Sequence, residues 1–586
     1  MSLKIRSSLA ALGLLLAACS AQPTSSSSTD EVRSITNAEA LADFDQMANA
    51  FRGMYGALER KEARYGFEFE KIVVEYRARV AASKSEPEAM GVYQEFLARF
   101  QDAHISLSTQ IESNDSYSYA LPFRVMPVGD TYVVYILGEG AEALKRGEEL
   151  LSINGVSTAD MYTELQKYQS VPNELAKKHF TAGSFTYRQS FQLGTTDYSK
   201  PAKLSIRGLD GVTREVEMEW GKYGNLLVEA DEAAREAAEA PVPQGGQSGP
   251  ENTVSASPRA LEVIRSELNK QGSRVPFFMT PQVRTALGVT EVTPSFAQLV
   301  KYKISAEQAA KVNYFAGKYV VNGKRILVLR IPHYSPTDAT VALSYIRALL
   351  EEQAPQVDGL VVDDGHNPGG NIAFATGLLG ILAKTQLNGY VQRMHADRLW
   401  LGTYSYWANY ESRADYKAVF LDYAHDIDKA YTNGEPLSGP IPFYRKDNFI
   451  QVDTTLNWKK PVMMLQDALS VSCADLVPLV FKRNKIGATF GETTMGGGGS
   501  VEEVASLVNT QASLSISRGV GTVFDPTGVY PEEDIIEDNG VPPTVPFTHT
   551  LEDFRAGYIG YVTAFNKVMT DQIAAETAAP APAAGQ

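Results

Sequence analysis

The stretch Pro461–Ser500, PVMMLQDALSVSCADLVPLVFKRNKIGATFGETTMGGGGS, decides the fold and points to the chemistry of this chain. Its apolar run Val462–Leu465 predicts a short buried strand, and the amphipathic segment Ala474–Arg483 predicts a helix. Ser472 stands in the loop between them, next to helix N–H groups that favour developing negative charge. A hydroxyl at a strand–loop–helix junction is typical of the nucleophile of a hydrolase.

The same stretch resembles the C-terminal-processing (tail-specific) serine peptidases of family S41. Their pattern is a serine followed by two small residues and an acid, and then a GETT or GEPT turn. Ser472-Cys473-Ala474-Asp475 and Gly491–Gly496 match these two motifs. Most of the family has a lysine as general base where this chain has Gly497. Because serine is a weak nucleophile without an adjacent base, either the base comes from elsewhere or the site is inactive.

A histidine far upstream is the first candidate for that base. Phe100–Leu107, FQDAHISL, resembles the Leu-x-Asp-Gly-His-Thr-x-Leu motif of the lysine-free branch of the family, which includes the tricorn-type peptidases. The resemblance implies that His104 takes the serine proton, and an imidazole suits this role near neutral pH. His366 is the alternative base, although it falls at a variable place in its motif.

The segment that contains His366, Leu360–Asn371, resembles the family's Asn-Pro-Gly-Gly strand and loop. In the family this loop supplies backbone N–H groups to the oxyanion hole. The resemblance therefore implies that Gly369 or Gly370 holds the oxyanion together with the N–H of Cys473. Cys473 is also a free thiol beside Ser472 and is an alternative nucleophile, since thiols need less activation than hydroxyls.

The third catalytic group is expected to be an acid. Ile536–Pro543, IEDNGVPP, resembles the family's Glu-Asn-x-Gly-Val-x-Pro-Asp element, which implies that Glu537 supports the histidine directly or through water. Asp538 is the adjacent alternative for this role. The segment could also be an acidic surface turn without a catalytic function. The resemblance implies no metal and no cofactor, and the remaining histidines lack metal-ligand spacing.

The N-terminus predicts a lipoprotein. A basic start and the apolar run Leu9–Ala18 are typical of a secretory signal. Leu16–Cys19 resembles a bacterial lipobox, in which Cys19 is lipidated; the alternative is an ordinary cleaved signal. Ser20 resembles the signal for outer-membrane sorting, so we expect a lipid-anchored protein of the bacterial cell envelope that faces the periplasm.

Length and charge fit this organisation. A chain of 586 residues is too long for one core, and a net charge of −15 argues against nucleic acid as a partner. Leu144–Gly155, LKRGEELLSING, resembles the PDZ signature. The predicted parts are a signal peptide at 1–19, a disordered tether at 20–35, an N-terminal helical region with His104 at 36–116, a PDZ-like domain at 117–227, a flexible linker at 228–258, an S41-like core at 259–572 and a disordered tail at 573–586.

The expected fold is an α+β multidomain protein with an α/β peptidase core of the ClpP/crotonase type and an inserted PDZ-like β domain. The expected function is that of a serine endopeptidase that hydrolyses protein or peptide substrates through Ser472, His104 and Glu537. The alternative is a catalytically inactive lipoprotein that binds peptides or apolar ligands on the same scaffold. Length and domain order resemble a chlamydial member of the branch, which implies a homodimer and self-cleavage within 228–258.

Overall fold

The computed structural model describes residues 35–108, 117–224, 274–312, 314–443, 447–456 and 458–578. The predicted signal peptide, almost all of the tether and the whole predicted linker lie outside the described residues. The last helix, α19 (Ile559–Ala578), includes residues 573–578 of the predicted disordered tail, and these residues are therefore helical. Ile573 is buried against the core, so this part of the chain is fixed by apolar packing.

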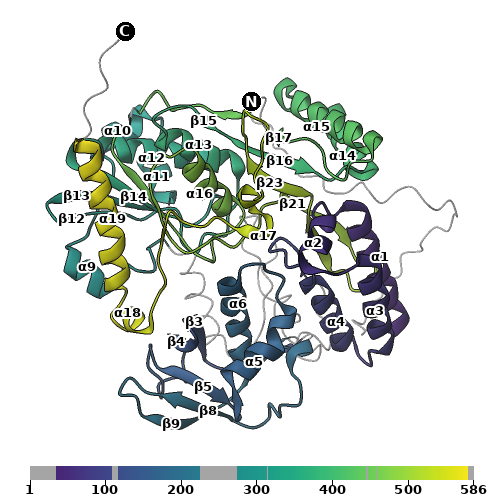
Figure 1. Cartoon of the computed structure of the whole chain (residues 1–586). Helices are drawn as coiled ribbons and strands as arrows, with labels where there is room; N and C mark the ends of the chain where they lie inside the picture. The colour runs from purple at the N-terminus through teal and green to yellow at the C-terminus, as the bar shows by residue number, and fades with distance from the viewer. Residues whose placement is uncertain are drawn as a thin grey trace, which may run out of the picture.

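A seven-stranded sheet forms the centre of the molecule (Figure 1). The strands from β13 to β24 in its order are parallel to one another, and β11 and β12 add an antiparallel edge. Parallel strands covered on both faces are near-continuous apolar runs, which explains why the run Val462–Leu465 predicted β19. The order is β11 (Thr290–Glu291), β12 (Ala316–Val321), β13 (Lys324–Arg330), β14 (Gly359–Asp363), β19 (Val462–Gln466), β20 (Thr489–Gly491) and β24 (Val545–Pro546).

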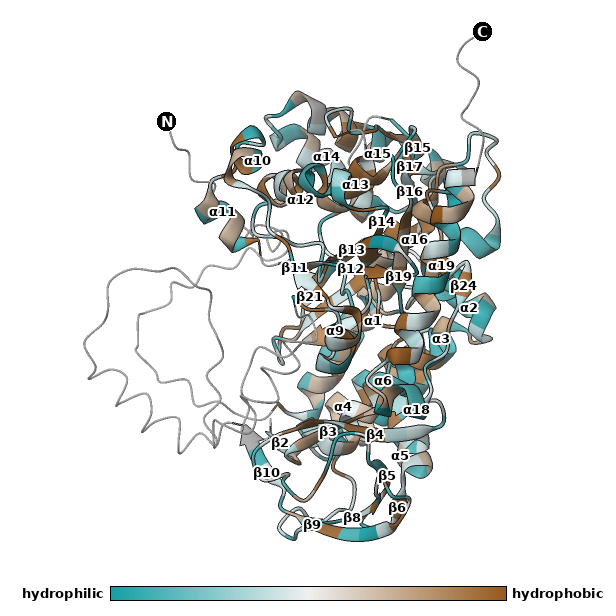
Figure 2. Cartoon of the chain, turned by 90° about the vertical axis from the view of Figure 1, so that its left-hand side faces the viewer, coloured by the Kyte–Doolittle hydropathy of each residue, from teal (hydrophilic) through white to brown (hydrophobic). Residues whose placement is uncertain are grey.

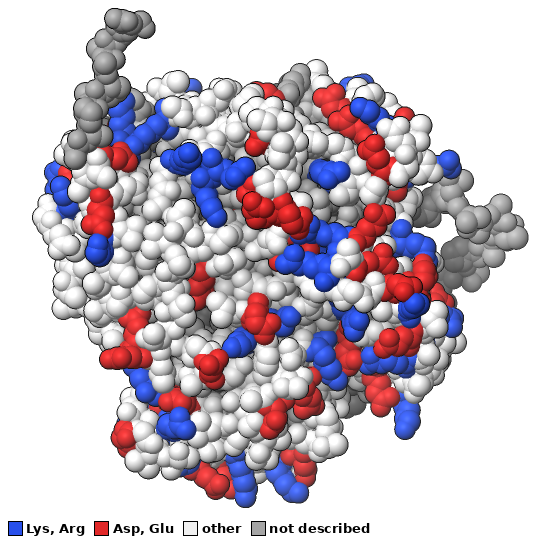
Figure 3. Space-filling model, viewed as in Figure 1, with Lys and Arg blue, Asp and Glu red and all other residues white. Residues whose placement is uncertain are grey.

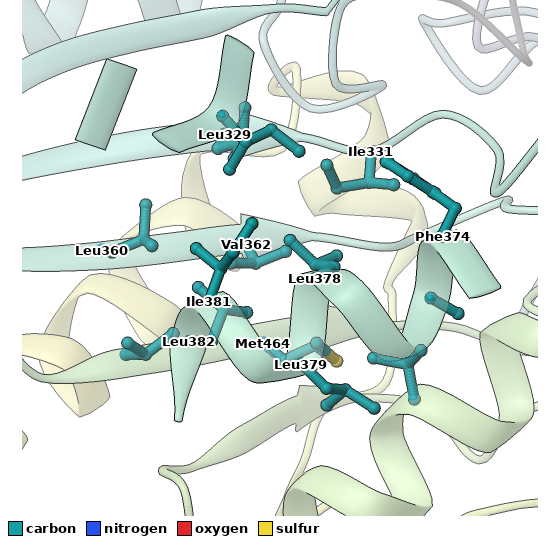
Figure 4. Close-up of a cluster of buried hydrophobic side chains, with 14 of the residues drawn as sticks. Leu329, Ile331, Leu360, Val362, Phe374, Leu378, Leu379, Ile381, Leu382 and Met464 are labelled. Carbon is teal, nitrogen blue, oxygen red and sulfur yellow. The ribbon is translucent and has the colours of Figure 1, made fainter. Parts of the chain in front are cut away.

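Helices cover both faces of this sheet. One face packs against α12 (Ala339–Gln353), α13 (Ile372–Leu382) and α16 (Cys473–Arg483). Figure 4 shows leucine and phenylalanine side chains of α13 against side chains of β13, β14 and β19. Each fully buried side chain of this kind contributes about 1.5–3 kcal/mol. The other face packs against α9 (Pro281–Leu287), α18 (Leu551–Arg555) and α19.

Residues 37–98 form the predicted helical region, drawn in purple in Figure 1. Its helices are α1 (Asn37–Met54), α2 (Leu58–Tyr65), α3 (Phe69–Ala82) and α4 (Glu86–Ala98). Their aromatic core continues into the hairpin β21 (Val501–Ser506) and β22 (Ser513–Ser517). The strand that follows His104, β1 (Ser106–Ser108), pairs with β22 in register Ser106 to Ser515. These contacts bring His104 to the core although it lies far away in the sequence.

The region predicted as a PDZ-like β domain contains the expected strands and also two helices that were not predicted from the sequence. The turn after β5 has Asn154 at φ 52° and Gly155 at φ 80°, as an Asn-Gly hairpin turn requires. The sheet contains β3 (Phe123–Val128), β4 (Thr131–Leu137), β5 (Glu149–Ile153), β6 (Val156–Ser157), β8 (Ala202–Arg207) and β9 (Thr213–Met218), and the helices are α5 (Thr158–Leu165) and α6 (Glu174–Thr186). A smaller sheet joins β2 (Tyr117–Ala120), β7 (Tyr187–Gln189) and β10 (Gly221–Gly224). Figure 2 shows this region at the opposite end from the core helices.

The remaining elements surround the core. They are α10 (Phe296–Lys301), α11 (Ala306–Lys311), α14 (Arg398–Tyr410), α15 (Ala414–Asn433), α17 (Ile536–Asn539), β15 (Leu387–Asn388), β16 (Tyr390–Met394), β17 (Ile441–Pro442), β18 (Phe449–Ile450) and β23 (Gly519–Val523). On the face in Figure 3, charges of both signs are interspersed, and they lie next to one another over α2 and α17. Among the described residues, none of the helices is long and apolar enough to cross a membrane.

Candidate active site

Ser472 lies at the N-terminus of α16, as the sequence predicted. It is the residue that caps this helix, with φ 64° and ψ −119°. A non-glycine residue with positive φ stores strain that is typical of functional sites. Its backbone N–H donates to Asp475 Oδ2 at 2.8 Å, which fixes the strained turn and leaves the partly exposed serine at the end of the helix.

Gly497 separates the loop before Ser472 from the His104 ring. A methyl group on Gly497 would lie 2.8 Å from Val471 Cγ2, 3.4 Å from Ala103 Cβ and 3.5 Å from His104 Cε1. The position at which most of the family has its lysine is therefore bordered by the imidazole of His104. Glycine at 497 leaves room for the His104 ring, because a side chain at 497 would compete with the ring for the same volume.

The turn that carries His104 is held by Asp102. Asp102 Oδ1 accepts the His104 backbone N–H at 2.8 Å, and its Oδ2 accepts the hydroxyls of Tyr55 and Ser517, each at 2.9 Å. Both ring nitrogens of His104 are buried without a hydrogen-bond partner among the described residues. Burial lowers the pKa of His104, although the nearby Asp102 acts in the opposite direction. A neutral imidazole with a free nitrogen is the form that a general base requires.

The glycine loop predicted for the oxyanion hole packs directly against Ser472. A methyl group on Gly369 would lie 2.6 Å from Ser472 Cβ and 2.9 Å from the Cys473 nitrogen. The Gly369 N–H is already bonded to Asn367 Oδ1 at 2.8 Å. Within the described part of the chain, the N–H groups of Gly370 and Cys473 donate to no acceptor. Of the two glycines considered from the sequence, Gly370 is thus the one with a free donor.

The Cys473 thiol does not have the environment of a nucleophile. It is buried, and its Sγ donates to the carbonyl of Gly370 at 3.1 Å. Burial raises the pKa of Cys473 to about 12, so the reactive thiolate is scarce at neutral pH. This environment favours Ser472 over Cys473.

Glu537 and Asp538 share one buried lysine that the sequence analysis did not predict, and we call Lys61, Glu537 and Asp538 the Lys61 cluster. Lys61 Nζ donates to Glu537 Oε1 and to Asp538 Oδ1, each at 2.5 Å, and all three side chains are fully buried. Lys61 also donates to the carbonyl of Gln101 at 2.9 Å. Burial opposes the charge of Lys61, but Glu537, Asp102 and Asp538 hold its pKa above the ordinary value. The lysine remains charged and is not a second base.

The two acids of the cluster face different neighbours. Asp538 is turned toward the helical region, where it accepts from Arg60 at 2.8 Å and from the Tyr65 hydroxyl at 3.0 Å. Glu537 Oε2 accepts the N–H of Gly498 at 3.2 Å, next to the glycine that borders His104. Burial and the nearby Asp102 raise the pKa of Glu537. The structure brings Glu537 to the wall of the site but not onto the His104 ring.

Two further residues fix the walls of the site and were not predicted. Asp475, the acid of the serine motif, accepts N–H groups of Gly496 at 2.9 Å and Gly497 at 3.1 Å. Asn173, at the start of α6, donates to the carbonyls of Thr493 and Thr494 at 3.0 Å each. The role of Asp475 could have been predicted, because it is the acid of the motif Ser472–Asp475. No motif in the sequence indicated that Asn173 or Lys61 would reach the site.

His366 lies in the glycine loop, and its Nδ1 contacts Asp467 Oδ2 at 2.5 Å. The ring therefore lies at ion-pair distance from a carboxylate although its Nδ1 lacks hydrogen-bond geometry, and this charge partner makes His366 the weaker candidate for the base. Among the described residues, no cluster of three or more histidine, cysteine, aspartate or glutamate side chains could hold a metal ion.

Comparison with known proteins agrees with this geometry. Residues 325–547 match the model of Peptidase family S41. A protein of Chlamydia trachomatis serovar D is 24% identical, with 90% of this chain and 91% of that protein covered. An uncharacterized protein of Chlamydia muridarum is 23% identical, with 91% and 93% covered.

Solved structures share the fold. The structure of mature CPAF complexed with lactacystin has a TM-score of 0.69 at 19% identity and covers 92% of this chain and 99% of its own. A second structure of mature CPAF has a TM-score of 0.68 at 19% identity, with 92% and 98% covered. The family resemblance seen in the motifs is confirmed for the catalytic part of the chain: residues 325–547 match peptidase family S41, a family of serine peptidases.

Proposed function

We propose that this chain is an active endopeptidase that uses Ser472 as nucleophile and His104 as general base. The observation that carries the proposal is the contact of His104 with Gly497, which itself packs against Val471, the residue before Ser472. The base that most of the family takes from position 497 is supplied here by a histidine 368 residues before the serine (472 − 104).

In this proposal Ser472 Oγ attacks the peptide carbonyl carbon while its proton passes to His104. The oxyanion that forms is held by the N–H groups of Gly370 and Cys473, and each such donor contributes about 10²- to 10³-fold in rate. His104 then gives its proton to the leaving amine. A water molecule hydrolyses the acyl-enzyme, with His104 again as the base.

Glu537 is the acid that we assign as the third group, in preference to Asp538. Its support is the bond to Gly498, which follows the Gly497 that borders His104, whereas Asp538 is occupied by Arg60 and Tyr65. Hydrogen bonds between catalytic groups commonly tighten only when substrate is bound. In this role Glu537, held by Lys61, fixes the backbone of Gly498 next to the glycine that borders His104.

A fluorophosphonate probe tests the proposal, because it labels only an activated serine. Labelling should disappear in Ser472→Ala and fall at least 100-fold in His104→Ala, while Glu537→Gln should be slower than wild type. Cleavage of a denatured protein such as casein should follow the same order. Equal labelling of wild type and Ser472→Ala would reject the peptidase mechanism and favour a binding protein on the same scaffold.

The address and assembly of the protein are part of the proposal. We infer a lipid anchor at Cys19 that holds the peptidase on the outer membrane facing the periplasm. Cys19→Ser should release the protein from the membrane fraction, and unchanged membrane association would contradict the anchor.

We further infer a homodimer, tested by light scattering of the released protein. Self-cleavage within 228–258 should be seen as fragments that Ser472→Ala lacks.

The PDZ-like assignment of residues 117–227 belongs to the same proposal. Its support is the motif at 144–155, which forms β5 and the Asn154–Gly155 turn. Binding of peptides with a free C-terminus to the Ser472→Ala protein, compared with the same peptides as C-terminal amides, would test it. Equal affinity for both forms would exclude recognition of a free carboxylate.

A further inference from the structure

Two loops determine where the oxyanion donors lie relative to the nucleophile. The oxyanion loop, residues 364–370, follows β14, and the nucleophile loop, residues 467–472, follows the adjacent parallel strand β19. Val471 N–H donates to the carbonyl of Asn367 at 3.0 Å, and the Ser470 hydroxyl donates to the carbonyl of Asp364 at 2.9 Å. The geometry of catalysis depends on the registration of these two loops.

One carboxylate joins both loops. Asp467 accepts the backbone N–H of His366 at 2.9 Å and contacts the His366 ring Nδ1 at 2.5 Å. The same carboxylate accepts the N–H of Leu469 at 3.0 Å and the hydroxyl of Ser470 at 3.2 Å, both in its own loop. Within the described residues, the contact of the His366 ring with Asp467 is the only one that joins a charged side chain of the oxyanion loop to the nucleophile loop. Removing the ring would break this contact.

The backbone of His366 is itself constrained. Its φ is 55°, a conformation that non-glycine residues seldom adopt. The residue stands where it must turn the chain from β14 toward Gly369, and its ring packs on Phe277 with centroids 4.9 Å apart. Such strain persists only where the surrounding contacts impose it. The bonds to Asp467 are those contacts.

We propose that the His366–Asp467 pair is the clasp that holds the oxyanion loop against the nucleophile loop, so that both residues are positioning residues of the reaction. The inference rests on the proposed role of Ser472. It assigns His366 a function other than that of the base: the residue sets the distance between the N–H of Gly370 and the carbonyl under attack.

The charges around the clasp make it dependent on pH. Burial opposes the charge of the His366 ring, but Asp467 outweighs it and holds the pKa of His366 above the ordinary value. Although burial acts against it, the His366 charge holds the pKa of Asp467 below its ordinary value. The other titratable groups that face His366 are His179 of α6, Arg330 of β13, Asp363 of β14, Glu492 and His549.

The sign of the effect follows from these directions. A group with a raised folded pKa stabilises the protein below its unfolded pKa, and this stabilisation is lost as pH rises through the folded pKa. The clasp is thus closed at pH values below the raised pKa of His366 and opens as the pH rises through it, when the His366 ring loses its proton. Activity should decline on the alkaline side at a pH above about 6.5, the ordinary pKa of histidine.

The experiment uses the full chain and compares His366→Gln, Asp467→Asn and the double variant. His366→Gln keeps a polar side chain without the charge. We expect the rate of fluorophosphonate labelling and kcat on a peptide to fall about 10- to 1,000-fold, with KM changed less than threefold. The double variant should be no slower than the slower single variant, because both changes break the same contact.

The chain offers a matched control in a second histidine–aspartate pair. His395 Nδ1 contacts Asp397 Oδ2 at 3.0 Å at the start of α14, apart from the two loops. His395→Gln and Asp397→Asn should label within twofold of wild type. His366→Lys supplies a cation that persists at alkaline pH, so it should recover part of the rate and shift the alkaline decline upward. The thermal melting temperature of each variant separates lost positioning from lost folding.

The possible outcomes distinguish the inference from the proposed function. If Ser472→Ala and His104→Ala abolish labelling while His366→Gln labels within twofold of wild type with the same alkaline decline, the clasp is wrong and the mechanism stands. If Ser472→Ala labels like wild type, the mechanism itself is wrong. If His366→Gln is slow but His366→Lys is equally slow and has the same pH profile, charge at 366 has no role and the clasp is refuted.

Discussion

Replacing Gly497 with alanine tests whether the small residue at this position is what admits the His104 ring. The added carbon would lie 2.8 Å from Val471 Cγ2, 3.4 Å from Ala103 Cβ and 3.5 Å from His104 Cε1. Because carbon atoms pack at roughly 3.5–4.0 Å, the first contact is about 0.7 Å too short. Val471 or the loop that carries it must move.

We expect Gly497→Ala to lower the free energy of unfolding by about 1–3 kcal/mol, the ordinary cost of overpacking. The effect on catalysis should be larger in proportion, since Val471 directly precedes Ser472 and a misplacement of about 1 Å costs roughly 100-fold in rate. The rate of fluorophosphonate labelling and kcat should fall about 10- to 100-fold. Circular dichroism melting would measure the stability change on the same samples.

Two comparisons make this result interpretable. Gly402→Ala, in the middle of α14, adds a methyl group that meets no atom within 4 Å. It should label like wild type and gain up to about 1 kcal/mol of stability, because alanine is the better helix former. Val471→Ala combined with Gly497→Ala removes the clashing carbon and should recover part of the rate. Wild-type labelling and melting of Gly497→Ala, or a double variant no faster than the single one, would refute the steric argument.

Three further predictions follow from the buried groups of the site. Lys61→Met should lower the unfolding free energy by about 3–5 kcal/mol, because it leaves buried carboxylates unpaired. The loss should be larger at pH 8 than at pH 6, because the raised pKa of Glu537 lets this partner of Lys61 take a proton at lower pH. Urea unfolding measures the loss, and the control Lys71→Met, at an exposed lysine, should cost less than about 1 kcal/mol. The acid limb of kcat/KM should have its midpoint below about 6.5, because burial lowers the pKa of His104; a midpoint above that value would contradict His104 as the base. Cys473→Ala should keep activity within about fivefold and wild type should resist thiol alkylation, since burial raises the pKa of Cys473 to about 12; loss of labelling in Cys473→Ala at unchanged stability would contradict a structural role for the thiol.

The sequence located the parts of the site that depend on local pattern. The apolar run at β19 predicted a buried strand of the α/β core, because strands buried on both faces leave little room for polar residues. Ser472 could be placed at a helix N-terminus from the change between a strand run and a helical repeat. The Asn-Gly turn after β5 could be predicted for a similar reason, since few residues adopt its backbone.

The sequence was less informative about helices in the inserted domain. The predicted β-rich region contains α6, which brings Asn173 to the carbonyls of the loop after β20. The apolar positions of this helix contact the loops of the site and not a core of its own domain alone. A helix whose packing face is divided between two partners gives a weak periodic signal in the sequence.

The sequence by itself therefore indicated the family of the core and predicted Ser472 and His104 as the nucleophile and the base. Only the tertiary structure decided why that replacement fits, because Gly497 and His104 meet across elements that are far apart in the chain. It also decided the partner of each acid: Asp538 pairs with Arg60 and Lys61, Glu537 with Lys61, and Asp467 with His366. Such charge pairs depend on distances between side chains in space, and these distances cannot be inferred from the spacing of residues along the chain.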